Sequence, residues 1–97
     1  MKQKLFVLHD RTAATYTAPN ASPNQGQAIR DLSDAVNNTA NRNLLTQHPE
    51  DISLLEVGEF DTDTGIITAH PVPILVVQAL QLVNPTQAPI PVTPLSE

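Results

Sequence analysis

The stretch from residue 22 to residue 38 constrains the fold most, because it carries a helical pattern together with a start signal. Ser22 precedes Pro23 and stands three residues before Gln25, an arrangement typical of a capping box with proline at the first helical position. An apolar stripe follows at helical spacing, which predicts an amphipathic helix of about four turns. The stripe contains Ile29, Leu32 and Val36, flanked by Ala28, Ala35 and Ala40, and Arg30, Asp31 and Asp34 point the other way.

Two short runs before this helix are rich in strand-forming residues. Residues 4–9 (KLFVLH) form an apolar run, and residues 12–17 (TAATYT) form a weaker one. The pair Asp10-Arg11 between them fits a tight connection. These runs therefore predict a first β-hairpin.

Two further runs after the helix predict a second hairpin. Residues 52–60 (ISLLEVGEF) and 65–69 (GIITA) flank an Asp-Thr-Asp-Thr segment that is typical of a turn. The alternation of the first run slips at Leu54-Leu55. The slip indicates burial on both faces or a bulge near Gly58.

The last quarter of the chain is ambiguous. In residues 72–83 (VPILVVQALQLV) the valines favour a strand, whereas Gln78, Gln81 and Asn84 recur every third residue, as on the polar side of a helix. We favour a short helix after Pro73 and keep the strand as the alternative. Residues 84–97 hold four prolines and predict an extended, polyproline-like arm.

These elements predict an α+β fold, with a small, mostly antiparallel sheet of two hairpins packed on one main amphipathic helix. Residues 1–83 would form a single domain, followed by the proline-rich extended arm at 84–97. The chain has 97 residues but only two phenylalanines and one tyrosine, so its core rests on Leu, Ile and Val. Because such a core is thin, we expect a homodimer or larger homo-oligomer.

Charge is distributed unevenly along the chain. The net charge is −5, but residues 1–42 contain five basic and three acidic groups, whereas residues 43–97 contain seven acidic and no basic groups. An acidic molecule repels phosphate overall, although the N-terminal half can still form a local basic face. The long uncharged stretch from Val72 is broken by prolines, so we expect no membrane span.

The segment Gly58–Pro71 (GEFDTDTGIITAHP) contains two motifs that suggest chemistry. Asp63-Thr64-Gly65 is the triplet of aspartic proteases, but the polar pair Asp61-Thr62 stands where that site needs an apolar strand. The D-x-D-x-G pattern resembles the start of a calcium loop, but its glycine falls one position too early. A turn explains the segment better, because Gly65 can supply a positive φ.

Other catalytic or metal-binding groups are sparse. There is no cysteine, and His9, His48 and His70 are not spaced as metal ligands. No serine stands in a strained elbow, and three scattered glycines cannot form a phosphate loop. We therefore expect no enzyme activity, no cofactor and no metal site.

Contact with nucleic acid is the remaining option for a site. Phe6 and Tyr16 lie on the two strands of the predicted first hairpin, which also carries cations, and aromatic rings beside cations can stack bases and bind phosphates. Phe6 is expected in the core, which leaves Tyr16 as the better candidate. The candidate DNA-binding residues are Lys2, Lys4, Arg11, Tyr16, Arg30 and Arg42.

Three segments in this order and spacing resemble the small nonstructural protein of gokushoviruses, which are single-stranded DNA bacteriophages of the microvirus group. The segments are GQAIRDLSDAVNN, HPEDISLLEVGEFD and DTGII. The resemblance covers residues 4–70, and it departs from the family pattern at Ile52, where an aromatic is expected. The proline-rich arm also falls outside it.

The resemblance implies a non-virion protein in the host bacterial cytoplasm that acts in viral DNA synthesis or packaging. It carries over no catalytic or binding residues. Two hypotheses follow: an accessory protein that binds single-stranded DNA through its cationic half, or an adaptor that binds a viral or host protein and has no affinity for DNA.

Overall fold

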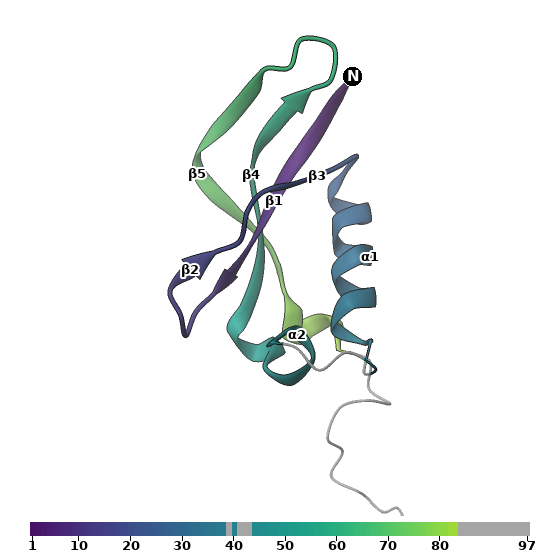
Figure 1. Cartoon of the computed structure of the whole chain (residues 1–97), viewed down its shortest axis with the longest axis vertical. Helices are drawn as coiled ribbons and strands as arrows, with labels where there is room; N and C mark the ends of the chain where they lie inside the picture. Colours follow the sequence, from purple (N-terminus) through teal and green to yellow (C-terminus); the bar gives the residue numbers. More distant parts are fainter. Residues whose placement is uncertain (39, 41–43, 84–97) are drawn as a thin grey trace, which may run out of the picture.

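Three long antiparallel strands form the centre of the fold in the computed structural model (Figure 1). They are β1 (Lys2–Asp10), β4 (Ile52–Asp61) and β5 (Ile67–Gln78), and the sheet order is β2-β1-β4-β5, with β3 also paired to β1. The main helix α1 lies along one side of this sheet (Figure 1), which confirms the predicted α+β class. The structure describes residues 1–38, 40 and 44–83.

The first hairpin is confirmed, but its second strand is short. β2 (Thr15–Tyr16) pairs antiparallel with the end of β1, where Tyr16 stands opposite His9. The turn is longer than predicted, and the Asp10 carboxylate accepts hydrogen bonds from two of its backbone N–H groups. A further strand, β3 (Asn20–Ser22), pairs with the middle of β1 and has no counterpart in the sequence prediction.

The second hairpin, β4–β5, is confirmed together with the bulge near Gly58. The pairing of β4 shifts register at this point against both neighbouring strands. A Cβ atom on Gly58 would lie 2.4 Å from the carbonyl oxygen of Thr68, so the strands meet too closely for any side chain. Glycine at this position therefore permits the close approach of β5.

Helix α1 (Gln25–Val36) is present, but its predicted start was wrong. The cap is Asn24, whose side-chain oxygen accepts a hydrogen bond of 2.8 Å from the backbone N–H of Gln27. Ser22 is buried in β3 and cannot cap, because pairing with β1 fixes it as a strand residue. The helix is also shorter than predicted, and Ala40 lies exposed beyond its end.

The short helix favoured after Pro73 was also wrong, since β5 continues through Gln78. Strand pairing decides the conformation there, with Leu75 opposite Leu55 and Val77 opposite Leu54. A 3₁₀ turn, η2 (Ala79–Leu82), then follows, in which the Gln81 side chain accepts a hydrogen bond from the Gln78 N–H. The spacing of these two glutamines thus reflects a turn that follows a strand. Asn84 and the predicted arm at 84–97 lie outside the described residues.

The core lies between the sheet and the helices. Two short helical segments, α2 (Leu44–Gln47) and η1 (Pro49–Asp51), lead into β4. None of the helices in the described part of the chain is long and apolar enough to cross a membrane. The buried core cluster consists of Phe6, Ala28, Leu32, Val36, Ile52, Leu54 and Ala79, with Leu8, Ile29, Leu45, Val76, Val77, Leu82 and Val83 packed against it.

Candidate functional site

Two of the candidate DNA-binding cations are paired with carboxylates. Lys4 Nζ lies 3.5 Å from a carboxylate oxygen of Glu56 and 3.5 Å from one of Glu59. Arg11 donates a hydrogen bond of 2.8 Å to Asp51, and this bond lowers the pKa of the Asp51 carboxyl. Both side chains therefore have acidic partners inside the molecule, which reduces the positive field that they offer to phosphate.

The other predicted residues are distributed over different parts of the fold. Lys2 is exposed at the start of β1, and Arg30 is exposed on α1. Tyr16 is 58% exposed and its ring centre lies 4.5 Å from that of His9. Arg42 lies outside the described residues.

The geometry of β1 separates these groups further. Lys2 stands at one end of the strand and Arg11 directly follows the other, which places them roughly 30 Å apart at the usual rise per residue. The candidate residues thus do not gather into one basic surface. Direct contact with DNA stays a prediction.

A buried carboxylate that the sequence analysis did not single out lies on the helix side of the sheet. Glu56 is only 3% exposed, although it stands in the middle of β4. It accepts hydrogen bonds from Gln25 of α1 (3.0 Å) and His70 of β5 (2.6 Å), and Lys4 of β1 lies beside it. These four residues, here called the Glu56 network, connect four elements.

The charge of Glu56 is stabilised by its neighbours. Burial alone would raise the pKa of this carboxyl, but the hydrogen bonds from Gln25 and His70 and the charge of Lys4 outweigh it and lower the pKa. The sequence did contain a signal, because Ile52, Leu54 and Glu56 alternate along one strand and so share a face. The network satisfies the buried charge and holds the start of α1 on the sheet.

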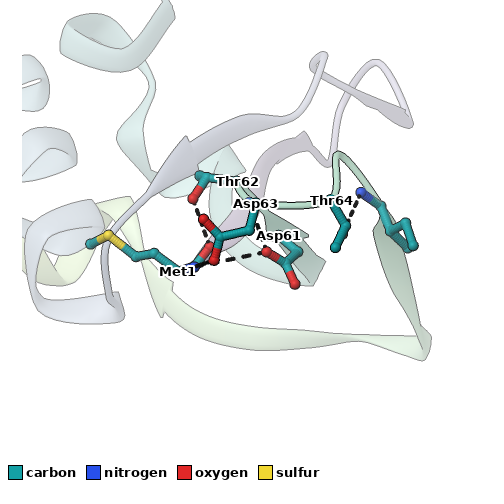
Figure 2. Close-up of polar contacts among 6 residues, drawn as sticks. Met1, Asp61, Thr62, Asp63 and Thr64 are labelled. Carbon is teal, nitrogen blue, oxygen red and sulfur yellow. Dashed lines mark hydrogen bonds and ion pairs between the residues drawn. The ribbon is translucent and has the colours of Figure 1, made fainter.

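The segment at 61–65 is a turn, as predicted (Figure 2). Gly65 adopts a φ of 75° and donates a hydrogen bond of 2.7 Å to the carbonyl oxygen of Asp61. The Asp61 carboxylate accepts a bond from the N–H of Asp63, while Thr62 donates to the carbonyl oxygen of Met1. Figure 2 shows the Met1 ammonium beside Asp61 and Asp63, so both carboxylates bind groups of the chain itself.

His48, Glu50 and Asp51 come together at the start of β4. Their potential ligand atoms all lie within 4.8 Å of one another. Arg11 already donates to Asp51, and His48 Nδ1 lies 3.3 Å from the Glu50 carboxylate. The three groups are thus explained by local polar contacts, namely the ion pair of Arg11 with Asp51 and the contact of His48 with Glu50.

An apolar groove runs beside β1, between the strand and the helices. Two adjoining cavities, of about 210 Å³ and 380 Å³, share Leu8, Thr17 and Leu45 as lining residues. The smaller cavity reaches α1, and the larger one reaches Ile52 and Tyr16. This surface, here called the β1 groove, is lined by Leu8, Thr17, Leu32, Ala35, Leu45 and Ile52.

The fold and its surfaces together define a small α+β domain with a buried ion-pair network and an apolar groove. The chain belongs to the Phage ORF5 protein family, whose family model matches residues 3–82. It is therefore a bacteriophage protein. No curated protein and no solved structure matches it.

Proposed function

We propose that this phage protein is a nonstructural accessory protein of the gokushovirus type, which assists viral single-stranded DNA synthesis or packaging by binding a viral or host protein in the host cytoplasm. The β1 groove is the observation that carries this proposal. The proposal follows the adaptor hypothesis, in which the chain itself has no affinity for DNA.

The size and lining of the groove fit an apolar side chain of a partner. A cavity of roughly 150 Å³ is enough to hold a benzene ring, and the smaller cavity has about 210 Å³. Phe6 and leucine side chains line it, and Thr17 and Asp31 add polar groups to the lining. Burial of an apolar anchor with a few polar contacts around it is the usual energetic pattern of a protein interface.

Electrostatics favour a protein partner over DNA. The chain carries a net charge of −5, and Lys4 and Arg11 both have carboxylate partners. Affinity for DNA depends mainly on cations that replace the counterions of phosphate. A protein partner requires no such excess of free cations.

The test compares two neighbouring positions of α1 that differ in their access to the groove. Ala35 lines the groove, whereas Asp34 is exposed and lines neither cavity. In Ala35→Phe the new ring fills the smaller cavity, so we expect at least a tenfold loss of affinity for the partner, while Asp34→Phe keeps the affinity within about threefold. Circular dichroism and thermal unfolding establish that both variants fold.

The partner is first identified by pull-down from nuclease-treated lysates of infected cells and mass spectrometry. Its binding to the purified variants is then measured directly. Equal affinity for Ala35→Phe and the wild type would remove the groove from the proposal. If every protein captured from an untreated lysate is lost once the lysate is treated with nuclease, that result would contradict the adaptor function.

Direct DNA contact is a second candidate, favoured by the exposed groups of the N-terminal half. Lys2 and Arg30 form no ion pair with the described residues, and the Tyr16 ring, which contacts His9, is 58% exposed. The signature of this mode is binding to single-stranded DNA that weakens as salt rises.

A further inference from the structure

The two faces of the sheet differ in what covers them. Phe6 and Leu54 point towards α1, because both belong to the core cluster with α1 residues. Residues next to them along a strand, such as Val7 and Leu55, therefore point to the opposite side. Both α-helices and η2 contribute to the same core cluster, so in the described part of the chain they all lie on one side of the sheet.

The opposite side, here called the outer face, is largely apolar. Val7 of β1, Leu55 of β4 and Leu75 of β5 stand in register and form a row across three strands. Beyond the bulge, Glu59 lies on the helix side, where it pairs with Lys4. Phe60 follows Glu59 in the strand and therefore lies on the outer face, as does Ile67, which stands opposite Phe60 on β5. The apolar residues of the outer face are Leu5, Val7, Leu55, Phe60, Ile67 and Leu75, and none of them belongs to the core cluster.

The outer face of the three long strands carries no Lys, Arg, Asp or Glu, and its polar residues include Gln3, His9 and Ser53. The Lys, Arg, Asp and Glu side chains of these strands all lie on the helix side. On β1, Lys2, Lys4 and Asp10 are an even number of residues from Phe6 and so point to the same side as Phe6. On β4, Asp61, Glu59 and Glu56 stand opposite Lys2, Lys4 and Phe6. β5 contains no Lys, Arg, Asp or Glu at all. A sheet with one face in water normally carries polar and charged residues on that face. An outer face without Lys, Arg, Asp or Glu therefore indicates that another molecule covers it when the protein functions.

We propose that the outer face is the interface of a homodimer, in which the sheets of two copies pack face to face. Two copies of a chain with a net charge of −5 repel each other, and an uncharged face lets them approach without opposing like charges. A twofold arrangement brings the same surface from both copies together, so it must be complementary to itself, as an uncharged apolar face is. The packing of two sheets is the geometry of a β-sandwich.

The area of the face is sufficient for a weak dimer. Three strands at a spacing of about 4.8 Å and a length of about 30 Å cover roughly 430 Å² in projection, and protruding side chains raise the accessible area above this value. Stable interfaces bury at least about 600 Å² on each partner. The outer face thus lies near this lower limit, in the size class of weak and transient interfaces.

This inference can be tested separately from the proposed function, because Leu75 and Ile67 of the outer face line neither cavity of the β1 groove, although Val7 lines the smaller one. It identifies the contact surface of the homo-oligomer that the thin core predicted. Two exposed leucines provide a matched pair of variants: Leu75 is 56% exposed on the outer face, and Leu80 is 52% exposed in η2. Both side chains are accessible in the monomer, so a glutamate at either position should leave the fold intact.

The experiment is sedimentation velocity on the full chain from about 1 µM to about 500 µM. We expect the wild type and Leu80→Glu to shift from 10.5 kDa to twice that mass, and Leu75→Glu to stay monomeric over the whole range. Ile67→Glu, on the same face at 64% exposure, should behave like Leu75→Glu. Circular dichroism confirms that each variant is folded.

Several outcomes would overturn the inference. A wild type that stays at 10.5 kDa up to the highest concentration has no such interface. Dimerisation of Leu75→Glu and Ile67→Glu at wild-type affinity would place the interface elsewhere. Loss of the dimer in Leu80→Glu but not in Leu75→Glu would assign it to the η2 end of the molecule.

Discussion

Glu56 shows how one residue can organise several elements. Its carboxylate is buried in a chain whose other acidic side chains in the described part are at least partly exposed. A buried charge is tolerated only where partners replace the lost water, and Gln25, His70 and Lys4 supply three. Because these partners come from α1, β5 and β1, the network fixes the packing of the helix start on the sheet.

Replacement of Glu56 should therefore destabilise the fold. Glu56→Gln removes the charge but keeps the shape, and its NH₂ group replaces one of the two acceptor oxygens, so either Gln25 or the pair of His70 and Lys4 loses its acceptor. We expect a loss of about 2–3 kcal/mol in the free energy of unfolding at pH 7, measured by urea denaturation. Glu59→Gln is the matched control, since Glu59 is 35% exposed and shares only Lys4; a loss under about 1 kcal/mol is expected there.

The contribution of Glu56 should depend on pH in one direction. Its pKa in the folded chain is lower than the ordinary value of 4.5, so the unfolded state takes up a proton first as the pH falls. The stabilisation is fully present above about pH 4.5 and is lost as the pH falls through the lower folded pKa. The stability difference between wild type and Glu56→Gln should shrink below pH 4.5, whereas a constant difference would contradict the role of the charge.

At the scale of elements, sequence patterns predicted the secondary structure correctly where contacts within the element determine its conformation. The stripe of Leu32 and Val36 predicted α1, and the turn residues around Gly65 predicted the second hairpin. Prediction failed where pairing with a distant strand decides. Ser22 has the chemistry of a cap but pairs with β1, and residues 72–78 have an ambiguous period that pairing with β4 resolves as a strand.

The corrected helix start leads to a prediction for Asn24. Its side chain satisfies the N–H of Gln27, which would otherwise lack a partner in the first turn. Asn24→Ala should lower the free energy of unfolding by about 1 kcal/mol, measured by thermal or urea denaturation. Asn24→Asp should retain the stability, because a carboxylate accepts the same bond; equal losses in both variants would show that the side-chain cap does not stabilise α1.

At the scale of the whole molecule, the sequence predicted the class of fold but not its surfaces. The resemblance to a phage family rested on ordered motifs, and the family match over residues 3–82 agrees with a phage origin. The candidate cations are close in sequence, yet the length of β1 separates Lys2 from Arg11, and acidic residues far along the chain neutralise two of the cations. The groove and the outer face depend on how the elements pack and on the register of the strands, and neither can be predicted from composition.

Binding of single-stranded DNA is the measurement that tests the adaptor function most directly. Non-specific DNA-binding proteins have dissociation constants of about 10⁻⁴ to 10⁻⁶ M, and these tighten as salt is lowered. With a fluorescein-labelled oligonucleotide at about 50 mM salt, we predict no change in anisotropy up to about 100 µM protein. Saturable binding that weakens with added salt and is lost in the K2A/K4A/R11A variant would contradict the account.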